Sequence, residues 1–158
     1  PAEIRETEFE KPRGIHRVEV RKGLARFHVS RLPDDLAAQR LMVLRAVADA
    51  GVSIDFLKFT PTGLSFVVQV PDSSTVEEAL KSRQWHFTAR CDRSVVLVHA
   101  VNMRDEVGLM AQIIAEALAC DAELEHLGDM HDRLLIVVPE ADADCLAERL
   151  QERLGGQP

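Results

Sequence analysis

The chain repeats one order of predicted elements, and this repeat constrains its fold more than any other feature. From Leu24 onward, the spacing of apolar residues predicts strand, helix, strand, strand, helix, strand. From Ser94 onward, it predicts strand, helix, strand, strand, helix, and the sequence then ends. A repeat of this size indicates a duplicated α+β unit, so that both copies must be explained together.

The second copy is one strand shorter than the first, whereas residues 15–20 (IHRVEV) form a strand pattern with no place in the first copy. The repeated order is that of the ferredoxin-like fold. Because an open sheet edge is a liability, we predict that residues 15–20 complete the second module. The first module is then inserted in the second. The predicted organisation is a flexible tail over 1–14, a first module over 21–91, and a second module over 15–20 plus 92–155.

Local signals give more detailed expectations. Lys22-Gly23 predicts a turn between two strands, and Gly51 predicts a left-handed helix end. The first helix is predicted to reach about Ala50 and the strand after it to begin at Val52, and Ser74 to Glu77 reads as a capping box. The residues expected to face the core from the first and third helices are Leu41, Leu44, Ala48, Leu109, Ile113, Ala117 and Leu118. The cysteines, expected as small buried apolar residues in a reducing compartment, are Cys91, Cys120 and Cys145.

Composition excludes some classes of function. The net charge of −7 argues against non-specific binding to nucleic acid, whose phosphates require a basic surface. No apolar run approaches the roughly 20 residues that span a bilayer, and the first residues lack the pattern of a signal peptide. We therefore expect a cytoplasmic protein with no membrane partner. No nucleophile or phosphate-loop signature is present in the sequence, so that neither an enzyme nor a cofactor is expected.

Several short motifs resemble those of ACT domains, and above all the paired ACT domains of aspartokinases. Residues 48–55 (ADAGVSID) are similar to the signature A-E-A-G-I-N-I-D, and residues 94–98 (SVVLV), with Met103-Arg104 and Val107-Gly108, are similar to the start of the second aspartokinase module. The likeness covers roughly residues 14–155, and the kinase motifs are absent. It implies a non-catalytic regulatory protein that binds an amino-acid effector of the lysine or threonine class and regulates an enzyme such as aspartokinase.

The resemblance also implies where the effector binds, because ACT effectors lie at a junction of modules, near the first helix and the second strand. A helix N-terminus suits the effector's carboxylate, and a side-chain carboxylate suits its ammonium group. The implied effector-binding residues are Asp34, Asp35, Leu36, Ser53, Asp55, Asn102, Arg104, Asp105, Val107, Gly108, Glu123 and Glu125. The resemblance also implies a homodimer.

Some residues depart from the ACT pattern and keep two alternatives open. Ala37-Ala38 replaces the usual proline-glycine pair at the start of the first helix. Val107 replaces a usual proline, and Ser53 replaces a usual asparagine. These departures favour a structural or protein-interaction module with a degenerate effector site. The other alternative is a metal site at the turn that contains His126 and His131, although their spacing matches no strong metal motif. Helix capping is the simpler role for Asp34, Asp35 and Asp105. For Glu123 and Glu125, the simpler role is to cover the solvent-exposed face of a strand.

Overall fold

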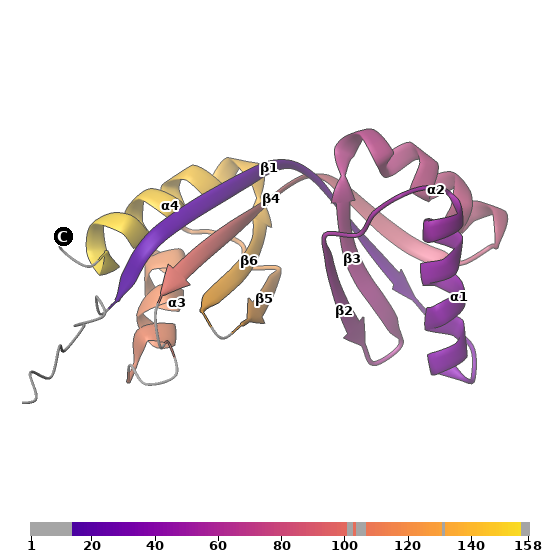
Figure 1. The fold of residues 1–158 in the computed structure, drawn as a ribbon, viewed down its shortest axis with the longest axis horizontal. Coiled ribbons are helices and arrows are strands. Elements are labelled where there is room, and N and C mark those ends of the chain that lie inside the picture. The colour runs from indigo at the N-terminus through magenta and orange to yellow at the C-terminus, as the bar shows by residue number, and fades with distance from the viewer. Residues whose placement is uncertain (1–13, 101–102, 104–106, 131, 156–158) are drawn as a thin grey trace, which may run out of the picture. The chain divides into compact units, whose positions relative to one another are not determined.

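The computed structural model describes residues 14–100, 103, 107–130 and 132–155, and these residues form six strands and four α-helices. In chain order the elements are β1 (Ile15–Ser30), α1 (Leu36–Asp49), β2 (Phe56–Thr60), β3 (Gly63–Gln69), the short 3-10 helix η1 (Val70–Asp72), α2 (Ser73–Ser82), β4 (His86–Ala100), α3 (Leu109–Ala119), β5 (His126–Asp129), β6 (Arg133–Pro139) and α4 (Glu140–Leu154) (Figure 1).

The chain divides into two compact units. One unit is Arg21–Val95, and the other combines the segment that ends at Val20 with the segment that begins at Val96. In the first unit the strands lie in the order β2-β3-β1-β4, and in the second in the order β1-β4-β6-β5. The first order is the 2-3-1-4 order of a ferredoxin-like sheet. The second is the same order when the β1 segment is counted as the last strand of its unit, after β4, β5 and β6. The predicted fold of two such modules, the first inserted in the second, is confirmed.

The first module has its core between one face of its sheet and the helices α1 and α2. In the antiparallel pairing of β1 with β3, Phe27 lies opposite Phe66, and both side chains are fully buried with their rings stacked 5.5 Å apart. Val43 and Val47 of α1 and Val76 and Leu80 of α2 pack into the same cluster. Such apolar burial is the main force that holds the module together.

The second module has a separate core in which the segment before Val20 takes part. Ile15 is fully buried with Ile113 of α3, Ile136 of β6 and Leu146 and Leu150 of α4. Val18 and Val20 pack partly buried against the same cluster. Ile15 also forms a parallel bridge to Gly155, just after α4. The strand that had no place in the first copy therefore belongs to the core of the second module.

The turn predicted at Lys22-Gly23 is wrong, because β1 continues through it from Ile15 to Ser30. Gly23 has a positive φ of 72°, which only glycine adopts readily, so that the strand changes direction locally without ending. β4 is also one continuous strand, from His86 to Ala100, where the sequence predicted two separate strands. Each long strand thus serves both units.

Three local predictions about helices and one about a strand were also wrong. Leu41 and Leu118 are 47% and 70% exposed instead of inward, and the buried positions of α1 are Val43 and Val47. The capping box at Ser74 is absent because η1 leads directly into α2 at Ser73, with no side-chain cap at Asp72. The strand predicted to begin at Val52 begins instead at Phe56. The positive φ of Gly51, 79°, is confirmed.

Candidate functional site

The N-terminal end of α1 carries the first group of predicted effector-binding residues. Asp35 is the N-cap residue, in the left-handed conformation, and its side chain accepts a hydrogen bond of 3.4 Å from the backbone N–H of Ala38. Asp34 is exposed beside it, and Leu36 begins the helix half-buried. The Asp35 carboxylate thus satisfies one of the free amide groups that a ligand's carboxylate would otherwise meet.

Arg40 ties this end of α1 to the hairpin between β2 and β3. Its guanidinium donates hydrogen bonds to the backbone oxygens of Gly63, at 2.9 Å, and Thr60, at 2.5 Å. It also lies over the ring of Phe59, 4.8 Å from the ring centre. Arg40 was not predicted from the sequence, because nothing near α1 in the sequence indicates contact with a hairpin twenty residues further on.

Ser53 and Asp55 lie at the opposite end of α1, between the helix and β2. Both are exposed, and the Asp55 carboxylate accepts a hydrogen bond of 2.8 Å from Gln69. A helix of 14 residues is about 20 Å long, so that Asp55 and Asp35 are too far apart for one amino acid to contact both. Within one module the predicted residues therefore form two separate groups.

In the second module, α3 begins without a side-chain cap. Its N-cap residue is Gly108, which has a φ of 83° and no side chain with which to cap the helix. A Cβ built at this position would meet nothing within 4 Å. Val107 is 99% exposed. The predicted residues Asn102, Arg104 and Asp105 lie outside the described residues. Among the described residues, no side chain caps this end of α3, in contrast to the end of α1 that Asp35 caps.

Glu123 and Glu125 follow the other end of α3. Glu123 is exposed, and its backbone N–H donates a 3.2 Å hydrogen bond to Asp142 of α4. Glu125 is half-buried, and its backbone N–H donates to the oxygen of Val137 at 3.0 Å, which extends the β5–β6 pairing. As in the first module, the helix, here about 16 Å long, separates the acidic residues from its N-terminal end.

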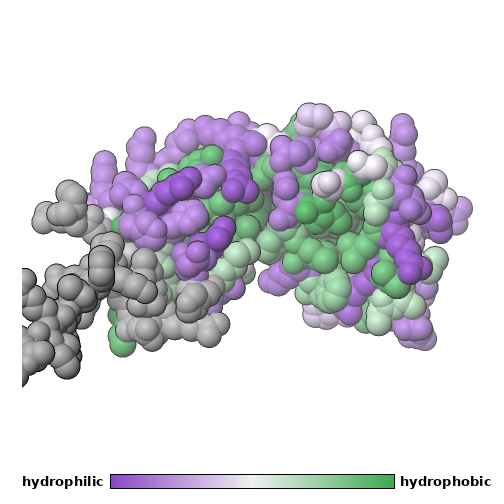
Figure 2. Space-filling view, in the orientation of Figure 1, coloured by the Kyte–Doolittle hydropathy of each residue, from purple (hydrophilic) through white to green (hydrophobic). Residues whose placement is uncertain are grey.

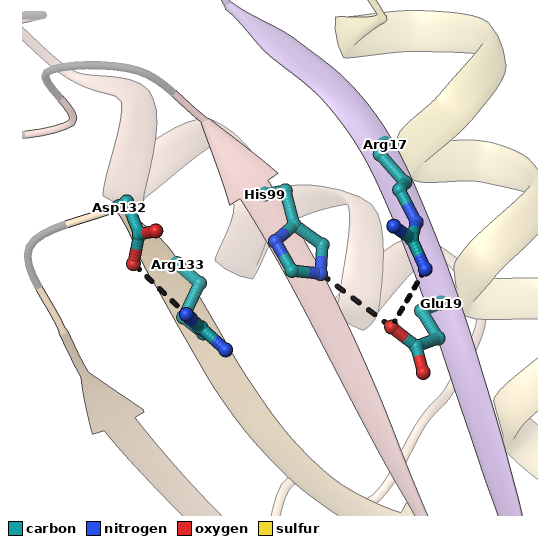
Figure 3. Close-up of polar contacts among 5 residues, drawn as sticks. All are labelled: Arg17, Glu19, His99, Asp132 and Arg133. Carbon is teal, nitrogen blue, oxygen red and sulfur yellow. Dashed lines mark hydrogen bonds and ion pairs between the residues drawn. The ribbon is translucent and has the colours of Figure 1, made fainter.

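Charged side chains also cross the sheet of the second module, from β1 through β4 to β6 (Figure 3). Glu19 accepts a hydrogen bond of 3.1 Å from Arg17, and its carboxylate lies 3.6 Å from Nε2 of His99. Arg133 donates to Asp132 at 3.1 Å, which lowers the pKa of the Asp132 carboxyl group. This row of side chains was not predicted from the sequence, since His99 stands in an almost continuous apolar run.

His28 and Ser65 form a polar pair on the sheet of the first module. They lie opposite each other on β1 and β3, and Nδ1 of His28 shares a 2.7 Å hydrogen bond with the hydroxyl group of Ser65, which is 1% exposed. Burial lowers the pKa of His28, and the positive charge of Arg26 adds to the shift. The folded module therefore disfavours protonated His28.

We expect this pair to make the stability of the first module depend on pH. Because the pKa of His28 is lower in the folded state, the neutral ring stabilises the module fully above the unfolded pKa of about 6.5. That contribution is lost as the pH falls below 6.5 toward the folded pKa. Urea unfolding between pH 7.5 and pH 5.0 should show a smaller decrease in stability for His28→Gln than for the unchanged protein. An equal decrease in both would contradict this role of His28.

The cysteines are not buried, contrary to the prediction. Cys91 and Cys145 are exposed and Cys120 is half-buried, and all three are free thiols. Within the described ranges, no cluster of three or more histidine, cysteine or acidic residues could hold a metal ion, and His131 lies outside these ranges. In the same part of the chain, no helix is long and apolar enough to cross a membrane.

The order of elements in each unit, with two helices packed on a four-stranded sheet, is that of a ferredoxin-like module. Protein-family models and curated protein sequences give no match to the chain. Solved structures do match it. The regulatory subunit of aspartate kinase from Thermus flavus has a TM-score of 0.77 at 18% identity, with 89% of this chain and 98% of that chain covered.

Two further structures agree. A chain from the structure of aspartokinase alpha and beta subunits has a TM-score of 0.76 at 20% identity, covering 87% of this chain and 97% of that one. Aspartokinase III of E. coli, in complex with lysine and aspartate, has a TM-score of 0.70 at 13% identity, covering 92% of this chain but 34% of that one. The predicted resemblance to aspartokinase regulatory regions is thus confirmed at the level of the fold.

Proposed function

We propose that this chain is a non-catalytic regulatory protein that binds an amino-acid effector of the lysine or threonine class and regulates an enzyme of amino-acid biosynthesis such as aspartokinase. The observation that carries the proposal is the nested pair of ACT modules, which matches an aspartate kinase regulatory subunit over nearly the full length of both chains. The E. coli relative, which was solved with lysine and aspartate, supports an amino acid as the ligand class.

Within this proposal, the N-terminal end of α3 is the better site for the effector's carboxylate. Free amide groups and the positive end of the helix dipole attract an anion. At α1 the Asp35 carboxylate already accepts from one of these groups and adds a negative charge, whereas no side chain among the described residues caps α3. Among the predicted effector-binding residues that the structure describes in this module, the acidic ones, Glu123 and Glu125, lie at the far end of α3. A carboxylate from another module would then hold the effector's ammonium group, which favours a homodimer.

Calorimetry with lysine, threonine and other amino acids, each up to millimolar concentration, tests this proposal. We expect saturable heat and a rise in melting temperature, because a ligand that binds only the folded state stabilises it. Gly108→Asp should weaken binding about tenfold or more, since its carboxylate would cap α3 and repel the effector. Gly108→Asn is the matched control, because asparagine also tolerates the positive φ but adds no charge.

The competing function is a structural or interaction module without an effector. Figure 2 shows hydrophobic surface on the first module. The exposed apolar residues Leu57 and Phe59 of β2 favour this function, because β2 lies at the end of the strand order and an open strand edge invites pairing. If no amino acid gives heat or raises the melting temperature, the regulatory proposal fails. A dimer in sedimentation experiments under the same conditions would then support the interaction module.

A further inference from the structure

Two free thiols meet between the last two helices of the second module. Cys120 is the C-cap residue of α3, and Cys145 lies in α4, 25 positions further along the chain. The thiol of Cys145 donates a hydrogen bond to the sulfur of Cys120 across 2.7 Å. The two sulfur atoms are thus less than 1 Å further apart than the ~2.05 Å of a disulfide bond.

The surrounding contacts fix the two helices at this point. Glu116, one turn before Cys120, pairs with Arg149, one turn after Cys145, through two contacts of 2.9 Å and 2.8 Å to the same carboxylate oxygen. Next to the thiols, Ala117 and Leu146 are fully buried in the core of the module. The thiols are therefore held together by the ordinary packing of the fold.

The pair is accessible from outside. Cys145 is exposed and Cys120 is half-buried, so that a small reagent reaches Cys145 first. The remaining cysteine, Cys91, is also exposed, but it belongs to the other unit, Arg21–Val95. The chain thus provides an internal comparison between a paired thiol and a thiol elsewhere.

We propose that Cys120 and Cys145 are a redox modification site, at which exchange with a low-molecular-weight disulfide such as oxidised glutathione forms a reversible cross-link between α3 and α4. The Cys145 thiolate attacks one sulfur of the small disulfide, forms a mixed disulfide and releases one small thiol. The Cys120 thiolate then attacks the Cys145 sulfur and releases the second small thiol. The protein loses two protons and two electrons, and the small disulfide is reduced to two thiols.

The environment of Cys120 makes the second step the slower one. Burial raises the pKa of the Cys120 thiol to about 11; the neighbouring thiol of Cys145 and the carboxylate of Glu116 act in the same direction, and Arg149 opposes them. Since only the thiolate attacks, little reactive Cys120 is present near neutral pH. The mixed disulfide at Cys145 should therefore accumulate first, and its conversion to the cross-link should become faster as the pH rises.

The full chain, incubated with oxidised glutathione, tests the proposal by thiol titration under denaturing conditions and by peptide mapping. We expect Cys120 and Cys145 to be joined in one peptide pair, whereas Cys91, which lies in the other unit, carries only a free thiol or a glutathione adduct. The cross-link should raise the melting temperature by roughly 5–10 °C, because it restricts the unfolded chain, and dithiothreitol should reverse the change.

Two variants provide the controls. Cys91→Ser should still form the cross-link at the same rate, whereas Cys145→Ser should form no internal disulfide and show no rise in melting temperature. Glutathione adducts on Cys120 and Cys145 separately, or a disulfide that involves Cys91 in place of this pair, would overturn the proposal. Three unchanged thiols after prolonged incubation would overturn it as well.

Discussion

Gly63→Ala is expected to destabilise the first module by about 3 kcal/mol, the upper end for forcing an extra carbon into a packed site. A Cβ at this position would lie 1.9 Å from the backbone oxygen of Val29 and 2.8 Å from its carbonyl carbon. These are backbone atoms of the adjacent strand, so that no flexible side chain can move aside. The β2–β3 hairpin itself must shift.

The hairpin cannot shift without further losses. Arg40 donates to the oxygens of Thr60 and Gly63, and the backbone N–H of Leu32 donates to Thr62 at 3.0 Å. Each of these hydrogen bonds contributes to stability, and those from the charged guanidinium contribute more. Moving the turn away from Val29 therefore also strains the contacts that attach it to α1.

Urea unfolding of Gly63→Ala beside Gly51→Ala measures this effect. Gly51 has a positive φ of 79°, but a Cβ there would meet nothing within 4 Å. Its substitution by alanine should cost only about 1 kcal/mol, the strain of a left-handed residue. A loss of stability in Gly63→Ala no larger than that in Gly51→Ala would show that the hairpin adapts to the extra carbon.

The strands and modules followed from the sequence because apolar spacing and strand count depend on the whole fold. The spare strand at residues 15–20 had a place in the second copy, which lacked a fourth strand, and it lies there. Gly23 shows where such reasoning fails. The same lysine-glycine pair occurs both in turns and in strands with a local irregularity. Here β1 continues through Gly23 and pairs with β3, a relation that the local sequence does not contain.

The side chains of the candidate site were less predictable. α1 has overlapping apolar stripes, and the choice of Val43 over Leu41 depends on how the helix rotates against the sheet. Arg40 and the Cys120–Cys145 pair join residues about 20 to 25 positions apart, a relation that no local pattern encodes. For Asp35, by contrast, helix capping is a local property, and the predicted cap is present.

Ile15→Ala is expected to destabilise the second module by about 3 kcal/mol, although residue 15 lies some 80 positions before the rest of that module. Ile15 is fully buried among residues of α3, β6 and α4, and removing three carbons leaves a cavity there. Hydrogen exchange should locate the effect. Amide protection should decrease in α3 and α4 and remain in α1 and α2, because the two cores are separate clusters.

Val43→Ala is the matched control, since Val43 is fully buried in the core of the first module. Its effect should be the reverse, with protection lost in α1 and α2 and kept in α3 and α4. If Ile15→Ala instead reduced protection first in α1 and α2, the first strand segment would not belong to the second core. Opposite patterns in the two variants would show that the nested chain folds into two cores with separate stabilities, joined by the long strands β1 and β4.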